Sequence, residues 1–214
     1  NMEIIFVEGN SSDNTWNEIQ SVINDEEFKK KKFTIKAFKQ NSTGKKNAVF
    51  TGFNKAKNEI LMILDGDLTV KPEELSKFWN KISSGEAEFI NGTRLIYPME
   101  RDAMRFLNYI ANKLFSQLFS WILGQRYTDT LCGTKVISKK NYMRATNFTK
   151  DLQNLDPFGD FFLIFASQRL NLKMIEIPVR YEPRAYGETQ ISRFRDGLKL
   201  IKMFLISFFK FKAF

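Results

Sequence analysis

The chain has 214 residues, of which 43% are hydrophobic and 27% are charged. This length suggests one domain, or one domain with an appendage, and the composition excludes a disordered or fibrous chain. Lys and Arg number 33 against 24 Asp and Glu, so the net charge of +9 favours anionic partners. The absence of histidine excludes a Ser-His-Asp triad and a His-ligated zinc site. A single cysteine, Cys132, excludes an intramolecular disulfide.

Strand-like and helix-like segments alternate through the first half of the chain, which predicts an α/β fold with a mostly parallel sheet flanked by helices. Thr15 and Glu18 fit a capping box at the start of the first helix. Pro72 marks the start of a later helix. We expect strands at residues 3–7, 33–38, 59–64 and 88–91, and helices at residues 16–24, 47–57 and from 72 onward.

The second half is richer in amphipathic helices. Residues 101–123 predict a long helix whose polar positions form one stripe, composed of Arg105, Asn108, Asn112, Ser116 and Ser120. A short strand at 133–137, a helix at 160–170, a strand at 174–181 and a loop at 183–190 follow. The last helix, at 193–209, has Phe194, Leu198, Ile201, Leu205 and Phe208 on one face and basic residues on another.

Asp65 and Asp67 follow the strongly apolar predicted strand at 59–64. Ligands of open α/β sheets bind at the carboxyl ends of strands. Two carboxylates one residue apart can share a hard divalent cation, and Mg²⁺ or Mn²⁺ suits carboxylates combined with substrate phosphates. A solvated acidic turn is the alternative interpretation.

A second polar turn follows the first predicted strand and contains Glu8, Ser11 and Asp13. In a parallel sheet it would open onto the same edge as Asp65. The alternative is that this turn only caps the following helix.

Five segments in this order resemble the motifs of family 2 glycosyltransferases with the GT-A nucleotide-sugar-binding fold, nearest the polyprenyl- and dolichol-phosphate sugar transferases. The segments are Val7 to Thr15, Gly44 through Ala48 on to Asp67, Asn91 to Arg94, Asp129 to Lys135, and Arg184 to Thr189. The first strand of the family has no counterpart, so the chain is expected to begin at the second strand.

The resemblance implies a Rossmann-like catalytic domain over residues 1–190 and a basic amphipathic helix over 191–214. It implies a metal-dependent, inverting transfer of a sugar from a UDP- or GDP-sugar donor to a polyprenyl-phosphate acceptor, with Mg²⁺ or Mn²⁺ as cofactor. Asp67 would bind the metal directly, and Asp65 would contact the metal or the ribose. The remaining donor contacts are expected from Glu8, Ser11, Asp13, Lys45, Arg105 and Lys135, and cationic assistance from Arg94 and Arg184.

Asp160 lies near the position where many members of the family place their catalytic carboxylate. It would be the general base if the acceptor were a hydroxyl, which is the alternative reading of a soluble transferase. A lipid phosphate is already an anion, so Asp160 could instead orient a basic residue or the sugar. It could also be only a helix N-terminal acid.

The basic, Phe-rich last helix favours an anionic membrane surface, on the cytoplasmic face of the cell membrane. Ten lysines and no acids lie between Phe28 and Asn58, but no nucleic-acid motif accompanies them, and we expect no nucleic-acid partner. The sequence leaves open whether the chain forms a homo-oligomer. A third reading is a non-catalytic membrane or nucleic-acid binding module.

Overall fold

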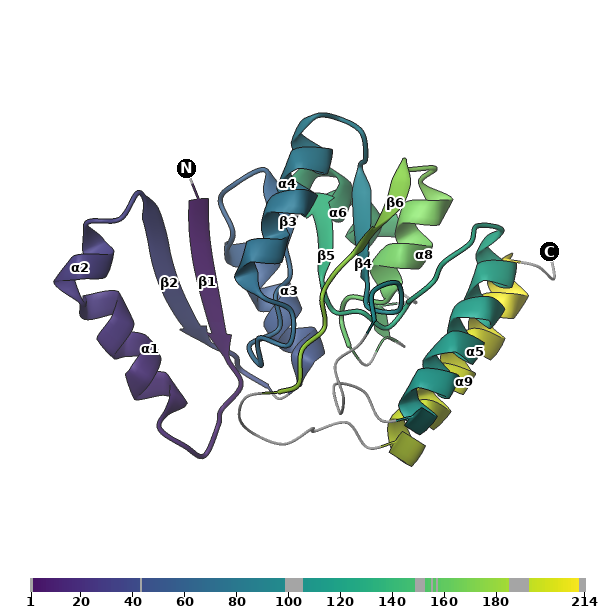
Figure 1. Cartoon of the computed structure of the whole chain (residues 1–214), viewed down its shortest axis with the longest axis horizontal. Coiled ribbons are helices and arrows are strands. Elements are labelled where there is room, and N and C mark those ends of the chain that lie inside the picture. The colour runs from purple at the N-terminus through teal and green to yellow at the C-terminus, as the bar shows by residue number, and fades with distance from the viewer. Residues whose placement is uncertain are drawn as a thin grey trace.

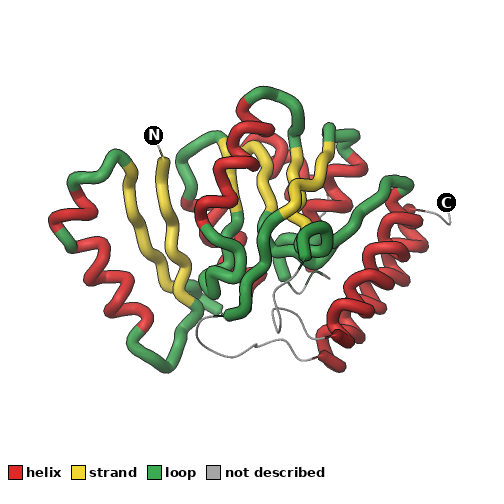
Figure 2. Tube along the Cα trace, viewed as in Figure 1, coloured by secondary structure: helices red, strands yellow, loops and turns green. Residues whose placement is uncertain are grey.

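The computed structural model describes residues 2–42, 44–98, 106–148, 153–154, 156, 158–184 and 193–211. Its strands form a two-stranded and a four-stranded sheet, with helices packed around them (Figures 1 and 2). The α/β class predicted from the alternating segments is therefore confirmed.

The first sheet consists of the parallel strands β1 (Met2–Glu8) and β2 (Phe33–Lys39). Parallel strands need a crossover connection, which contains α1 (Thr15–Asn24) and α2 (Glu26–Lys29). The capping box predicted at the start of α1 is wrong, because Thr15 already lies within the helix. The Thr15 backbone N–H and hydroxyl instead donate to Asp13 Oδ1, so the acid takes the place of the expected cap.

The second sheet has the strand order β3-β5-β4-β6. β5 runs antiparallel to both of its neighbours, while β4 and β6 pair in parallel. β3, β4 and β6 therefore share one direction, and β5 is the exception to the predicted parallel order. The strands are β3 (Ile60–Met62), β4 (Phe89–Thr93), β5 (Lys135–Ser138) and β6 (Met174–Pro178).

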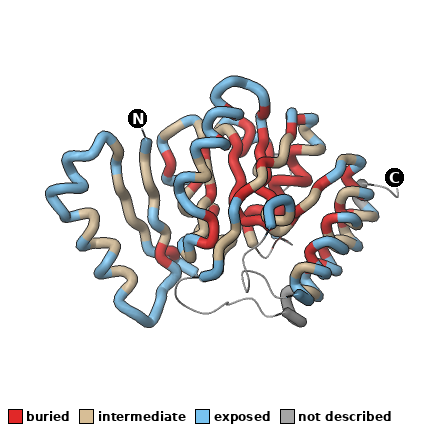
Figure 3. Tube along the Cα trace, in the orientation of Figure 1, coloured by how far each residue is buried: buried red, intermediate tan, exposed pale blue. Residues whose placement is uncertain are grey.

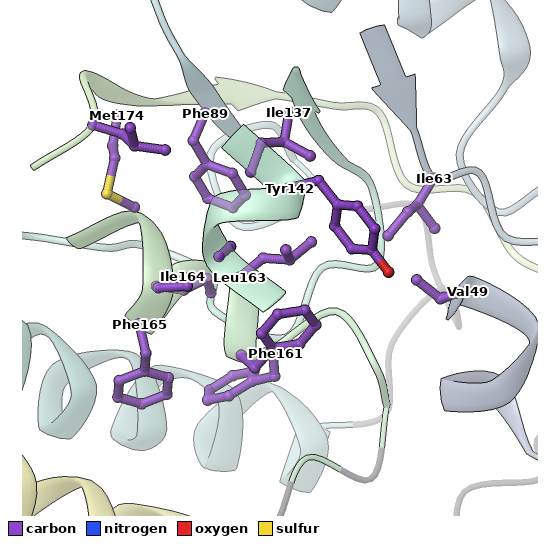
Figure 4. Close-up of a cluster of buried hydrophobic side chains, with 14 of the residues drawn as sticks. Val49, Ile63, Phe89, Ile137, Tyr142, Phe161, Leu163, Ile164, Phe165 and Met174 are labelled. Carbon is purple, nitrogen blue, oxygen red and sulfur yellow. The ribbon is translucent and has the colours of Figure 1, made fainter. Parts of the chain in front are cut away.

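A core of aromatic and aliphatic side chains fills the space between the sheets and the helices (Figure 4). Phe161 to Ala166, around the start of α8, are all at most 1% exposed. The Phe161 ring meets Phe119 edge-on at 4.9 Å, and Phe53 meets Tyr142 in the same way. The helices that surround the sheets are α3 (Lys45–Lys55), η1 (Pro72–Glu74), α4 (Leu75–Ser83), α6 (Lys139–Phe148) and α8 (Phe162–Arg169).

Two of these helices differ from expectation. Pro72 starts a 3₁₀ turn rather than a regular helix, and α4 begins only at Leu75. α6 has no counterpart among the predicted elements. The sequence of this segment is low in apolar residues, and among its described side chains Tyr142 and Ala145 belong to the core.

The long helix α5 (Phe106–Leu123) and the last helix α9 (Arg193–Phe211) lie side by side at one end of the molecule (Figure 1). The Trp121 and Phe208 rings stack at 5.5 Å between them. None of the helices in the described part of the chain combines the length and hydrophobicity needed to span a bilayer.

Asn112, Ser116 and Ser120 of the predicted polar stripe of α5 face inward, whereas Asn108 is exposed. Asn112 and Ser116 are 2–3% exposed, whereas Arg105 lies outside the described residues. The outer faces of α5 and α9 are exposed and apolar (Figure 3). They present Phe106, Leu107, Ile110, Leu114 and Trp121 from α5, and Leu198, Ile201, Leu205 and Phe209 from α9.

A buried polar network joins α5 to the second sheet. Arg94 donates to both carboxylate oxygens of Asp129, at 2.6 and 2.9 Å, and Asn112 of α5 donates to Asp129 Oδ1 at 2.9 Å. Asn91 of β4 donates to the Asp129 carbonyl and to Glu176 of β6. Burial opposes the charge of Asp129, but the charge and hydrogen bonds of Arg94 outweigh it and lower the pKa of that carboxyl.

Replacing Asp129 with Ala leaves the Arg94 guanidinium buried without its partner. We expect the free energy of unfolding to fall by about 3–5 kcal/mol, measured by urea denaturation. Glu86→Ala is the control, because its pair with Lys81 is about half exposed on both sides and should contribute little to stability. Equal losses in the two variants would contradict a structural role for the buried pair.

Candidate active site

The turn that follows β3 carries Asp65 and Asp67. Its backbone closes through the Leu68 N–H, which donates to the Asp65 carbonyl at 3.2 Å. Leu68 has a φ of 51°, in the left-handed region that side chains other than glycine rarely adopt. A sparsely populated backbone conformation of this kind tends to occur at functional sites.

Asp65 belongs to a cluster of alternating charges. Lys45, the first residue of α3, lies with its Nζ 2.8 Å from Asp65 Oδ1 and 3.3 Å from Asp160 Oδ2. Lys135 of β5 lies on the other side of Asp160, at 3.7 Å. Asp160 is 3% exposed and Lys135 is 1% exposed, while Asp65 and Lys45 are partly open to solvent. Four residues predicted as site residues are thus brought together from separate elements.

Ionisation in this cluster is governed by the mutual attraction of its members. Burial disfavours the charge of Lys45, but Asp160 and Asp65 outweigh it and raise the pKa of the ammonium group. For Asp65 burial also opposes the charge, and the attraction of Lys45 reverses this and lowers the pKa of the carboxyl. Both groups are therefore charged at neutral pH.

Gly133 allows the segment before β5 to close over this cluster. A Cβ placed on Gly133 would collide with Asp65 Oδ2 and with Lys45 Nζ. Any side chain at this position would therefore push the Lys45–Asp65 pair apart. Lys135 adds a second contact between this segment and the cluster, because its Nζ donates to the Cys132 carbonyl.

Asp67 has a different set of partners. Its Oδ1 accepts hydrogen bonds from the Thr69 hydroxyl at 2.9 Å and from the Thr69 N–H at 3.2 Å. Its Oδ2 lies 2.7 Å from Arg184 Nη2. The structure therefore joins two predicted site residues, Asp67 and Arg184, that are far apart in the sequence.

The donor set of Asp65 and Asp67 fits a hard divalent cation. Both are carboxylates, both are ion-paired, and they stand on one tight turn. In the described part of the chain, no third Asp, Glu, Cys or His joins them in a metal-ligating group. Mg²⁺ is usually bound by one or two carboxylates of the protein together with phosphates of the substrate. Asp65 and Asp67 would supply these carboxylates.

Of the other predicted site residues, those that the structure describes have their hydrogen bonds elsewhere, although the charge of Arg94 also helps to lower the pKa of Asp65. Arg94 is 13% exposed and is paired with Asp129. Glu8, Ser11 and Asp13 bond within their own turn, where Glu8 accepts the Ser11 N–H and Asp13 holds the first residue of α1. Arg105 lies outside the described residues.

Asp156 is a residue of this region that the sequence reasoning did not single out. It is 1% exposed and accepts the N–H groups of Phe158 and Phe162, so it shapes the turn that presents Asp160. Burial and the neighbouring charge of Asp160 raise the pKa of Asp156 to about 6. The Asp-Pro-Phe-Gly-Asp sequence contains both acids, and their spacing of four residues was the available signal.

Among solved structures, the chain is similar to glucosyl-3-phosphoglycerate synthase from Mycobacterium tuberculosis in complex with Mn²⁺, UDP and glucosyl-3-phosphoglycerate. The TM-score is 0.57 at 12% identity, over 97% of this chain and 68% of that chain. At this identity the likeness shows the fold, which is the GT-A fold of nucleotide-sugar transferases.

The sequence profile described as Glycosyl transferase family 2 matches residues 1–167. The chain belongs to this family, as the order of its motifs predicts. It is 25% identical to the low-salt glycan biosynthesis hexosyltransferase Agl6 of Haloferax volcanii, over 75% of this chain and 38% of that protein. It is 28% identical to a dolichol-phosphate mannosyltransferase of Pyrococcus furiosus, over 89% of this chain and 51% of that protein. The chain thus spans about half or less of these two relatives.

The pKa of Asp156 gives the folded protein a specific pH dependence. Because the folded-state pKa of about 6 lies above the ordinary 3.8, the folded state binds the proton more tightly. The resulting stabilisation is full below about pH 4 and is lost as the pH rises through 6.

We expect Asp156→Asn to remove this dependence. Between pH 4 and pH 7 the stability of the variant relative to the parent protein should rise by about 2 kcal/mol, measured by urea denaturation at each pH. Glu26→Gln, at a carboxyl that is 77% exposed, should keep the parent profile. A pH-independent difference between Asp156→Asn and the parent would contradict the assignment.

Proposed function

We propose that this chain is the catalytic part of a metal-dependent, inverting glycosyltransferase that moves a sugar from a UDP- or GDP-sugar to a polyprenyl-phosphate-type acceptor. The observation that carries the proposal is the placement of Asp65 and Asp67 at the end of β3, each beside a cation. Membership of family 2 supports the transfer reaction. Residues 1–190 would form the catalytic domain, and residues 191–214 its membrane-facing appendage.

In this proposal Asp67 holds Mg²⁺ or Mn²⁺, with Asp65 beside it. The cation would neutralise charge that develops on the diphosphate leaving group. Thr69 fixes one oxygen of Asp67, and Lys45 fixes the orientation of Asp65. Lys45, Lys135 and Arg184 supply positive charge at the same edge of the sheet, which would favour a bound diphosphate.

The surroundings of Asp160 favour an acceptor that needs no deprotonation. Asp160 is buried between the ammonium groups of Lys45 and Lys135. The Oδ2 atom of Asp160 is the oxygen that both ammonium groups contact, so it is already engaged in ion pairs. A phosphate acceptor is already ionised at neutral pH, so Asp160 would serve there to hold Lys45 and Lys135 in place. The dolichol-phosphate mannosyltransferase among the relatives supports this choice by its name.

The exposed apolar faces of α5 and α9 support a membrane location for the reaction. Lys113, Lys199 and Lys202 are exposed on the same two helices, and Trp121 is 57% exposed. Apolar and aromatic side chains combined with lysines are typical of helices that lie in a membrane interface. We therefore propose that this surface rests on the anionic cytoplasmic leaflet.

Asp67→Asn tests the metal site. The variant should lose Mn²⁺-dependent binding of UDP or GDP by at least about 100-fold, since a neutral amide is a poor ligand for a hard cation. Isothermal titration calorimetry with and without Mn²⁺ measures the loss, and the nucleotide that binds identifies the donor base. Glu73→Gln, at an exposed neighbouring acid, is the matched control. Unchanged binding in Asp67→Asn would remove Asp67 from the site, and no binding by the parent protein would favour the non-catalytic reading.

Leu114→Glu tests the membrane surface. Leu114 is 54% exposed on α5, so the change should spare the fold and weaken binding to phosphatidylglycerol vesicles by about tenfold or more, through lost apolar burial and added negative charge. Co-sedimentation with phosphatidylglycerol and phosphatidylcholine vesicles measures the effect. Trp79→Glu, at a 52% exposed aromatic residue on α4, should bind as the parent does. If Leu114→Glu instead dissociates a homo-oligomer without changing vesicle binding, the surface is a contact between copies.

A further inference from the structure

The segment that follows β6, residues 179–184, runs along the loop that carries Asp67. We call these residues the strap. The Glu182 N–H donates to the Thr69 carbonyl at 2.9 Å, and Lys71 Nζ lies 3.0 Å from Glu182 Oε2. At its start, the Val179 N–H donates to the Thr93 carbonyl. The strap is therefore anchored by contacts that do not involve Asp67.

Arg184 stands at the end of the strap and lies against Asp67. Its guanidinium is 2.7 Å from Oδ2, while Thr69 already occupies Oδ1. The side chains are 31% and 21% exposed, so the pair is only partly open to water. Both oxygens of the carboxylate are engaged, and its charge is compensated by a cation that belongs to the protein.

A divalent cation at Asp67 must therefore displace Arg184 or lie beside it. Displacement costs the ion pair, and coexistence brings two positive groups close together. A diphosphate changes this balance, because guanidinium pairs strongly and bidentately with phosphate oxygens. Since the strap is held at Val179 and Glu182, a change of partner by Arg184 does not require these anchors to break.

We propose that Arg184 competes with the divalent cation for Asp67 and that the donor diphosphate relieves this competition by accepting Arg184. The inference rests on the proposed metal-dependent function. Its consequence is positive coupling, in which the metal binds weakly to the free protein and tightly together with the nucleotide. Coupling is reciprocal, so the metal must raise the affinity for the nucleotide by the same factor.

Titration of Mn²⁺, followed by the electron paramagnetic resonance signal of the free ion, tests the proposal. It is carried out on the parent chain and on Arg184→Gln, with and without saturating UDP or GDP. We expect Arg184→Gln to bind Mn²⁺ alone about tenfold more tightly than the parent, and the gain on adding nucleotide to shrink by a similar factor. Arg184→Lys, which keeps the charge but not the forked geometry, should lie between the two.

Arg180→Gln is the matched control, because it removes the same residue type from an exposed position on the same strap. If it tightens Mn²⁺ binding as much as Arg184→Gln does, the effect is general electrostatics and the inference is wrong. Equal affinities of the parent and Arg184→Gln for Mn²⁺ alone also overturn it, yet the proposed function stands if nucleotide binding still requires Mn²⁺. Absence of Mn²⁺ binding in every form, with either nucleotide, overturns both.

Discussion

The buried ion pair between Arg94 and Asp129 holds together the elements on which the candidate site depends. It joins the end of β4 to the segment before β5, and Asn112 extends it to α5. Because a buried charge without its partner is strongly destabilising, this segment cannot move away without a large loss of stability. The same segment carries Gly133 against the Lys45–Asp65 pair. The position of the charged cluster is thus set by a pair that is not part of it.

Asp65 and Asp67 are each paired with a cationic side chain of the protein. Lys45 compensates Asp65, and Arg184 compensates Asp67, so neither acid stands as an unpaired charge. Such pairing orients the carboxylates, but it also means that a bare cation gains little by entering. A ligand that carries its own negative charge, such as a diphosphate, can instead satisfy the cations that a metal displaces. In the function that we propose, this arrangement would favour joint recognition of a metal and an anion over binding of either alone.

Local patterns in the sequence were sufficient for the parts of the structure that depend on neighbouring residues. The apolar run before Asp65 predicts β3. The ordered motifs single out Lys45, Asp160 and Arg184, and in the structure Lys45 pairs with Asp65 and Asp160 while Arg184 pairs with Asp67. Pairings between distant segments could not be obtained this way. One example is the antiparallel direction of β5, and another is the pairing of Arg94 with Asp129, which lies 35 residues away. Both depend on tertiary packing, which the hydrophobic periodicity of a sequence does not encode.

The helix α5 shows why the periodicity of a sequence does not define the orientation of a helix in the fold. Its polar stripe is visible in the sequence, but a stripe does not say which side faces the protein. The structure turns Asn112, Ser116 and Ser120 inward because they have partners there. The Ser120 hydroxyl accepts the Tyr127 N–H, the Ser116 hydroxyl accepts the Thr130 N–H, and Asn112 donates to Asp129. These contacts order the loop that leads into the site. Phe119, Ile122 and Leu123 of α5 are buried in the core, whereas other apolar residues of the helix, such as Leu114 and Trp121, are exposed. One row of side chains therefore fixes both the position of Asp129 and the outward direction of the apolar surface. The exposed apolar surface is therefore held in a defined orientation relative to Asp65 and Asp160.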